Sequence, residues 1–213
     1  LETMVTFKPH VTAILNITPD HLDRHKTLEN YIAIKESITK NQDENDFCVL
    51  NYNDPVLREF GKTPRCKVIF FSSSEKLESG VFLRGDTMII KENGVETPVC
   101  TTKDTSLVGM HNYENIMAAI AMTHAMGVPL DTIRQGIKEF TAVEHRIEFV
   151  AEKNGVKYYN DSKGTNPDAA IKAVCAMPSP TILIGGGYDK KSSYDEWVAT
   201  FEGRVKELLL IGK

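Results

Sequence analysis

The sequence predicts an α/β protein built in two consecutive parts. Short apolar runs rich in β-branched residues alternate with segments whose apolar residues recur every three or four positions, as strands and helices do. In the last third of the chain this alternation becomes a strand–helix–strand–helix–strand series. Such a series predicts a parallel sheet with right-handed crossovers.

The composition is that of an ordinary globular protein. The 213 residues are 41% hydrophobic and 25% charged, which suffices for a sizeable core. A net charge of -4 argues against a general nucleic-acid surface, so we expect no nucleic-acid partner. No apolar run approaches the ~20 residues of a membrane span, so we expect no membrane insertion. The cysteines lack a CxxC pair and zinc-ligand spacing, which is typical of reduced thiols in the cytoplasm.

Local patterns predict the elements of the N-terminal part. Val11–Leu15 is a short apolar run that delivers residues 16–21 to the carboxyl end of a strand, where α/β proteins place their ligands. A helix follows, with Thr27 as its N-cap and an apolar stripe that begins at Leu28 and Tyr31. Further expected elements are strands at 47–50 and 67–71, a short helix at 54–60, β-hairpins within 81–100, and helices at 111–126 and 131–140, the last with Asp131 as its N-cap.

A loop that separates these helices from a new run of strands divides the chain into predicted parts 1–142 and 143–213. The second part opens with strands at 147–151 and 156–159, joined by Asn154-Gly155, a dipeptide typical of tight hairpins. The strand at 156–159 also starts the parallel series. Its other members are helices at 168–177 and 194–201 and strands at 181–184 and 205–211.

The turn at residues 159–167 carries the clearest chemical signal, because it lies where a strand passes to a helix. Free N–H groups at a helix start make such turns natural anion sites. Here the turn adds a carboxylate, an ammonium group and two hydroxyls, from Asp161, Lys163, Ser162 and Thr165. Few purely structural turns need all four groups.

Two weaker candidates lie in the N-terminal part. Asp20-His21, with Asp23-Arg24, places a carboxylate and an imidazole at a strand end, which suits a metal or a phosphate. An equally consistent interpretation is that Asp20 begins a helical turn and His21 is a surface residue. Lys35 flanks an apolar helix face, where a lysine usually extends its ammonium group to water.

Three more motifs are ambiguous when taken separately. Asn112 and Asn115 can face one flat ligand such as an adenine ring, although Asn112 as a helix cap is the simpler interpretation. In Glu144-His145-Arg146, the arginine can clamp a phosphate or carboxylate, or form an interdomain salt bridge. Gly185-Gly186-Gly187 lets backbone approach a ligand, but it is neither a GxGxxG nor a GxxxxGK[ST] loop.

Taken together and in this order, the motifs resemble those of the Mur ligases, the ATP-dependent amide-forming enzymes of peptidoglycan synthesis. The turn at 160–166 is most similar to the branch that adds D-glutamate to UDP-N-acetylmuramoyl-L-alanine. The resemblance spans essentially the whole chain and rests on Asn160–Asn166, Leu15–Arg24, Tyr31–Lys35, Gly109–Asn115, His145-Arg146 and Gly185–Lys190.

The resemblance implies a fold, a reaction and two substrates. The fold is an incomplete central Mur-ligase ATPase domain over 1–142, followed by part of a Rossmann-like, parallel-sheet C-terminal domain over 143–213. ATP phosphorylates a carboxylate to an acyl phosphate, which the amino group of D-glutamate then attacks. This chemistry needs charge neutralisation and placement more than a protein nucleophile. The enzyme is expected to be a cytoplasmic bacterial monomer.

The resemblance also implies roles for particular residues. The matches for Mg²⁺ ligands are Glu2, His21 and Lys35, the last after carbamylation by CO₂. The matches for the catalytic groups are Lys35, His21 and Lys163. For the substrates, the matches are Asn112 and Asn115 for adenine, Arg146 and Asp161 for the phosphates and ribose of ATP, and Lys163, Thr165 and Lys190 for D-glutamate. Two ammonium groups and a hydroxyl suit a substrate with two carboxylates.

Two other function classes fit parts of the sequence. A related Mur or folylpolyglutamate-type ligase would use a different amino acid, and the turn at 160–166 argues against it. A noncatalytic nucleotide-binding module would share the strand–helix series, and the missing GxGxxG fingerprint argues against that.

Residues 1–213 alone are predicted to be inactive. The family's phosphate loop is expected before Leu1, and further D-glutamate contacts are expected after Lys213. The check is phosphate release by this piece with ATP, D-glutamate and UDP-N-acetylmuramoyl-L-alanine. Turnover by the isolated piece would contradict the prediction.

Overall fold

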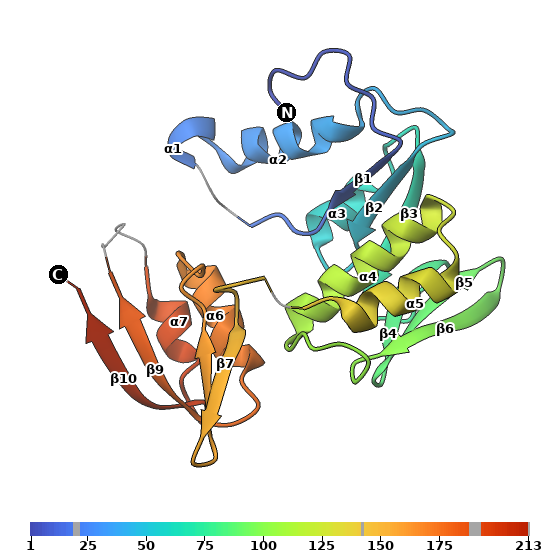
Figure 1. The fold of residues 1–213 in the computed structure, drawn as a ribbon. Helices are drawn as coiled ribbons and strands as arrows, with labels where there is room; N and C mark the ends of the chain where they lie inside the picture. Colours follow the sequence, from blue (N-terminus) through green and yellow to red (C-terminus); the bar gives the residue numbers. More distant parts are fainter. Residues whose placement is uncertain (19–21, 142, 188–192, 213) are drawn as a thin grey trace. The chain divides into compact units, whose positions relative to one another are not determined.

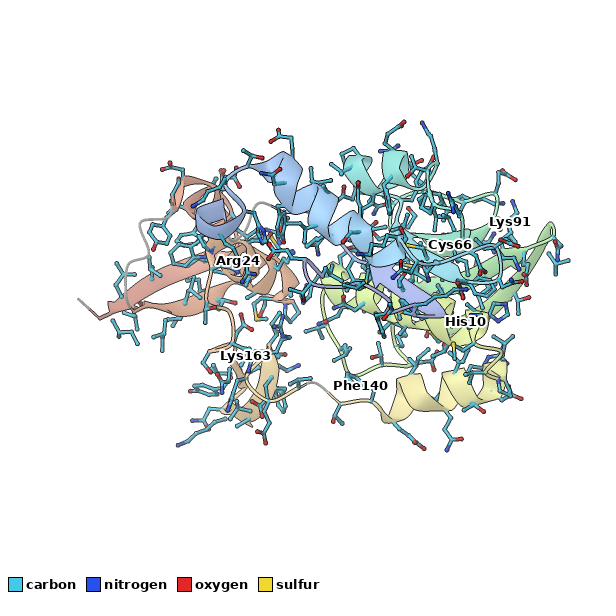
Figure 2. The ribbon with its side chains drawn as sticks, turned by 90° about the horizontal axis from the view of Figure 1, so that it is seen from above. His10, Arg24, Cys66, Lys91, Phe140 and Lys163 are labelled. Atoms are coloured by element: carbon cyan, nitrogen blue, oxygen red, sulfur yellow. The ribbon has the colours of Figure 1, made fainter. Side chains whose placement is uncertain are left out.

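A computed structural model describes residues 1–18, 22–141, 143–187 and 193–212 of the chain. These residues fall into two compact units (Figure 1). The first unit comprises Leu1–Thr105 with Tyr113–Glu139, and the second comprises Ser106–Asn112 with Phe140–Lys213. Phe140, labelled in Figure 2, directly follows the last helix of the first unit. The α/β class is confirmed, and no helix in the described ranges is long and apolar enough to cross a membrane.

The first unit is built on one mixed sheet in which the strands lie in chain order, β1 to β6. β1 to β4 run parallel, and β5 and β6 are antiparallel additions at one edge. Their bounds confirm the predicted strands and hairpins: β1 Val11–Ile14, β2 Phe47–Asn51, β3 Lys67–Ser72, β4 Gly80–Arg84, β5 Thr87–Glu92 and β6 Val95–Thr101. Ile14 pairs with Leu50 and Leu50 with Phe70, so β1, β2 and β3 end at the same edge.

The helices of this unit begin largely where their caps predict. They are α1 Leu22–His25, α2 Leu28–Glu36 with a 3-10 turn at Ser37–Thr39, α3 Pro55–Phe60, α4 Met110–Ala125 and α5 Leu130–Glu139. The first three residues of α4 belong to the second unit. The Thr27 side chain accepts from Asn30 N and confirms the predicted cap. Asp131 as a cap is wrong, because it lies inside the first turn of α5 and the Pro129 carbonyl begins the helix by accepting from Ile133 N.

The core lies mainly in the first unit. Cys48, Leu50 and Leu57 are completely buried and form one cluster between β2 and α3. On α4, the predicted apolar positions Ile116 and Ile120 are buried, as expected from their helical spacing. Burial on this scale stabilises a side chain by about 1.5–3 kcal/mol, so this unit holds most of the hydrophobic stabilisation described here.

The second unit confirms the predicted elements but not the predicted sheet. Its elements are β7 Glu148–Lys153, β8 Val156–Asn160, α6 Pro167–Ala176, β9 Thr181–Gly186, α7 Asp195–Ala199 and β10 Val205–Ile211. β9 and β10 pair in parallel, whereas the described part of β8 pairs only with β7, antiparallel, across the predicted Asn154-Gly155 turn. The expectation that β8 joins the parallel sheet is therefore wrong. Apolar periodicity identifies a strand but does not determine its partner.

Replacement of Gly80 by Ala should strongly destabilise the first unit. Gly80 has φ +122°, and an added Cβ would lie 2.2 Å from the Phe70 carbonyl oxygen. A fixed backbone atom cannot be displaced cheaply, so we expect a loss of roughly 3 kcal/mol or more in the free energy of unfolding. Gly94→Ala is the control, because Gly94 has φ +79° and open space around its Cβ position. If urea titrations showed equal losses of unfolding free energy in the two variants, the overlap between the added Cβ and the Phe70 carbonyl oxygen would be contradicted.

Candidate functional site

The carboxyl edge of β1, β2 and β3 gathers polar groups from distant parts of the first unit. At the end of β1, Lys35 Nζ lies 3.2 Å from the Asn16 carbonyl oxygen and 4.7 Å from the centre of the Tyr31 ring. The Lys35 ammonium group is therefore held beside the strand end, where parallel sheets place ligands.

A second group of side chains at this edge was not predicted from the sequence. Ser73, which follows β3, donates to Glu114 Oε1 of α4 at 2.6 Å. Asn53, which follows β2, donates through Nδ2 to Ser73 Oγ at 2.6 Å and lies 3.3 Å from the same Glu114 oxygen. Ser72 Oγ in turn donates to Asn53 Oδ1 at 2.6 Å. The network ties α4 to the ends of β2 and β3.

The predicted metal ligands are only partly described. Arg24, labelled in Figure 2, donates to Glu2 Oε2 at 2.5 Å, and this bond lowers the pKa of the Glu2 carboxyl below its ordinary value. His25 Nδ1 lies 3.2 Å from the other Glu2 oxygen, without hydrogen-bond alignment. His21 lies outside the described residues, and those residues contain no group of three or more His, Cys, Asp or Glu side chains suited to a metal. By themselves they do not fit a Mg²⁺ site.

The two asparagines predicted to contact adenine lie in different environments at the start of α4. Asn112 is the third helical residue and is buried, and its Nδ2 donates to the Val108 carbonyl at 2.7 Å. The interpretation of Asn112 as the helix cap is therefore wrong, because its side chain donates where an N-cap accepts. Asn115 is exposed one turn later.

In the second unit, the turn between β8 and α6 is built by its own polar side chains. Asn160 Oδ1 accepts from Ser162 N at 3.0 Å, and the Asp161 carbonyl accepts from Gly164 N at 2.8 Å. Asn166 is the N-cap of α6, with Oδ1 accepting from Ala169 N at 2.8 Å. Two side chains, those of Asn160 and Asn166, thus shape the turn together with its backbone.

Asp161 links this turn to the segment before β7. Its Oδ1 accepts from Ile147 N at 3.0 Å, and Ile147 has an unusual φ of +47° for a β-branched residue. Partial burial raises the pKa of the Asp161 carboxyl, while the Ile147 N–H and the Arg146 charge act in the opposite direction. A Cβ at Gly164 would lie 2.5 Å from Asp161 Oδ2, so any larger residue there would displace this carboxylate from its present position.

The side chains predicted to contact D-glutamate lie on the outer face of the turn. Lys163 and Thr165 are exposed, and Lys163 N donates to the His145 carbonyl at 2.9 Å (Lys163 is labelled in Figure 2). This bond fixes the Lys163 backbone and leaves its ammonium group toward solvent. Lys190, the third predicted contact, lies outside the described residues.

Positive charge gathers around His111 at the start of α4. Burial lowers the pKa of His111, and the charges of Lys172 and Arg146 lower it further, against an opposing effect from Asp168. Arg146 is exposed, and no hydrogen bond or ion pair within the described ranges occupies its guanidinium group. Lys172 pairs with Asp168 at 2.7 Å, so Arg146 is the available cationic group near the Asp161 carboxyl, and its guanidinium group suits an anion.

Comparison with known proteins identifies the family. A family model described as the Mur ligase middle domain matches residues 1–123, more than half of the chain. The chain belongs to the Mur ligase family. This match confirms the family resemblance found in the sequence.

The relatives match the chain over its full length. A protein of Lachnoclostridium phytofermentans named "UDP-N-acetylmuramoylalanine--D-glutamate ligase" is 52% identical over 213 residues, all of this chain and 47% of that protein. A crystal structure of MurF from Acinetobacter baumannii matches with a TM-score of 0.70 at 19% identity, over 96% of this chain and 47% of that one. MurF from Thermotoga maritima in complex with ADP matches with a TM-score of 0.65 at 20% identity, over 95% and 52%. This Mur ligase chain spans about half the length of the curated relatives it matches.

The stability of this Mur ligase chain should fall in mild acid partly because of His111. Since its pKa is lowered on folding, the unfolded state binds the proton more readily as the pH falls through about 6.5. His111→Gln removes this contribution, so its stability should fall less than that of the wild type between about pH 7 and pH 5. Urea titrations across this range provide the check. Parallel curves for the two proteins would contradict it.

Proposed function

We propose that the full-length protein adds D-glutamate to UDP-N-acetylmuramoyl-L-alanine, with ATP as the energy source, in peptidoglycan synthesis. It would be a ligase that forms a carbon–nitrogen bond through an acyl phosphate. The observation that carries the proposal is the 52% identity, across all of this chain, to a relative named for D-glutamate ligation. The turn at 160–166 supports it with groups suited to an acidic amino acid.

The proposed reaction has two steps in which charge must be neutralised. The alanyl carboxylate attacks the γ-phosphorus of ATP, the bond to the bridging oxygen breaks, and ADP leaves. The D-glutamate amine then attacks the acyl carbon, a proton is lost from nitrogen, and inorganic phosphate leaves. Both steps place several negative charges close together, so cationic side chains that hold the reactants in position contribute most of the catalysis.

Lys163 and Thr165 are proposed to hold D-glutamate, together with Lys190. The backbone of Lys163 is fixed by its bond to the His145 carbonyl, whereas its side chain is exposed. A fixed backbone that presents a mobile ammonium group suits recognition of a side-chain or α-carboxylate. Lys163 is also the proposed catalytic cation of this unit.

ATP is proposed to contact Asn112, Asn115, Arg146 and Asp161. Arg146 has its guanidinium group available among the described residues, and a planar fork suits phosphate oxygens. Asp161 uses Oδ1 to accept from Ile147 N, which leaves Oδ2 for a ribose hydroxyl. The ADP complex of the Thermotoga maritima relative supports a nucleotide as ligand for this fold.

The remaining family expectations are part of the same proposal. Residues 1–142 would belong to the central ATPase domain and 143–213 to the Rossmann-like C-terminal domain of a cytoplasmic monomer. Glu2, His21 and carbamylated Lys35 would be the Mg²⁺ ligands, with Lys35 and His21 in the catalytic set. The described residues do not by themselves fit a metal site, so these metal roles rest on the family resemblance alone.

Lys163→Ala in the full-length protein should raise the KM for D-glutamate roughly tenfold or more while leaving binding of the nucleotide substrate nearly unchanged. The reason is loss of a charge-assisted contact, worth about 1.5–3 kcal/mol, to one substrate only. Lys157→Ala is the matched control, since Lys157 is an exposed lysine on the neighbouring strand β8. Steady-state phosphate release and calorimetry with UDP-N-acetylmuramoyl-L-alanine measure the two effects.

Two results would count against the proposed function. If Lys163→Ala weakened the binding of both substrates equally, the turn would have a structural role only. In a panel of amino acids offered to the wild type, preferred phosphate release with an amino acid other than D-glutamate would favour a related ligase.

A further inference from the structure

The three residues that follow β1 are held by side chains from three other places in the first unit. Each contact goes to a backbone atom of a different residue. Asn51 Nδ2 donates to the Leu15 carbonyl at 3.1 Å, Lys35 Nζ to the Asn16 carbonyl at 3.2 Å, and Ile17 N donates to Asp54 Oδ2 at 2.7 Å. We call Leu15–Ile17 with these contacts the β1-exit clamp.

Asp54 has two separate roles, one for each carboxylate oxygen. Its Oδ1 caps α3 by accepting from Val56 N at 2.9 Å and Leu57 N at 3.2 Å. Its Oδ2 is not needed for the cap and accepts from Ile17 N instead. An N-cap requires only one side-chain oxygen. The second oxygen therefore connects the helix start to the strand exit.

The exit segment Leu15–Ile17 is held through its backbone and through one of its side chains. Asn51 is the last residue of β2 and is buried, so its amide has little freedom. The Ile17 side chain packs against the buried cluster that contains Leu50 and Leu57. Backbone and side chain of the exit segment are thus both fixed to β2 and α3.

We infer that Asn51 and Asp54 are positioning residues for the reaction, acting through the β1-exit clamp. They fix Leu15 and Ile17, the neighbours of Asn16, and so orient the Asn16 carbonyl toward Lys35. This carbonyl in turn determines the position of the Lys35 side-chain nitrogen. The inference rests on the proposed function, because it concerns the place of Lys35 in that reaction. Neither residue was predicted from the sequence, and neither needs to touch a substrate.

Asp54→Asn separates the two roles of the carboxylate. An asparagine caps a helix as well as an aspartate does, but its NH₂ group cannot accept from Ile17 N. The matched control is Glu59→Gly, an exposed change in α3 that weakens the helix by about 1 kcal/mol and leaves Ile17 untouched. The known side-chain contact of Glu59 is a surface pair with Lys62.

Two measurements on the full-length protein test the inference. The first is exchange of the Ile17 amide hydrogen, followed by NMR, which should accelerate at least tenfold in Asp54→Asn and stay near wild type in Glu59→Gly. The second is kcat for D-glutamate-dependent phosphate release. It should fall roughly tenfold to a hundredfold in Asp54→Asn, as expected for a displaced catalytic group, with KM for ATP changed far less. Glu59→Gly should keep wild-type kcat at a temperature below its melting point.

The outcomes separate this inference from the proposed function. Unchanged Ile17 exchange in Asp54→Asn would overturn the clamp, and accelerated exchange with wild-type kcat would overturn its positioning role. Equal losses of kcat in Asp54→Asn and Glu59→Gly would show that only helix stability matters, which also overturns it. A wild-type protein without D-glutamate-dependent turnover would overturn the proposed function and the positioning role, while Ile17 exchange would still decide whether the clamp exists.

Discussion

Parallel pairing of β1, β2 and β3 is the constraint on which the first unit depends. Because the three strands end at one edge, the peptide groups just beyond them lose their ladder partners together. Polar side chains supply the missing partners: Asn51 serves the Leu15 carbonyl, and Ser72 accepts from Glu75 N. The peptide groups at the strand ends require hydrogen-bond partners, and the side chains that supply them therefore lie beside Lys35. A structural requirement and the candidate site thus arise from one arrangement.

Most elements could be predicted because their causes are local. The Thr27 cap and the Asn154-Gly155 turn act within four residues of chain, and the structure has both of them. The partner of β8 could not be predicted, since strand pairing depends on segments far apart in sequence. Asp131 failed for a different reason: an acidic residue favours both the cap and the first helical turn, and sequence pattern alone does not separate these.

The candidate site likewise contains residues that local sequence could predict and residues that it could not. The turn at 160–166 is contiguous, so its polar groups could be identified from the sequence. The hydrogen bonds by which Asn160 and Asp161 shape the turn could be identified only in the structure. The Ser73–Glu114 and Asn53–Glu114 contacts join residues 41 and 61 positions apart, and no local pattern marks them. Their one sequence signal was position, since Asn53 and Ser73 each follow the carboxyl end of a strand.

The hydrogen bond from Ile147 N to Asp161 Oδ1 couples the backbone shape at residue 147 to the side chain at residue 161. Ile147 is held at a φ of +47°, a conformation that costs a β-branched residue about 1–2 kcal/mol. Without the Asp161 carboxylate, that backbone is free to relax toward ordinary angles. A replacement of Asp161 thus changes the shape of the adjoining Arg146 segment as well as removing the proposed ATP contact. A glycine at 147 adopts this φ without strain, so it would tolerate losses at 161 that an isoleucine does not.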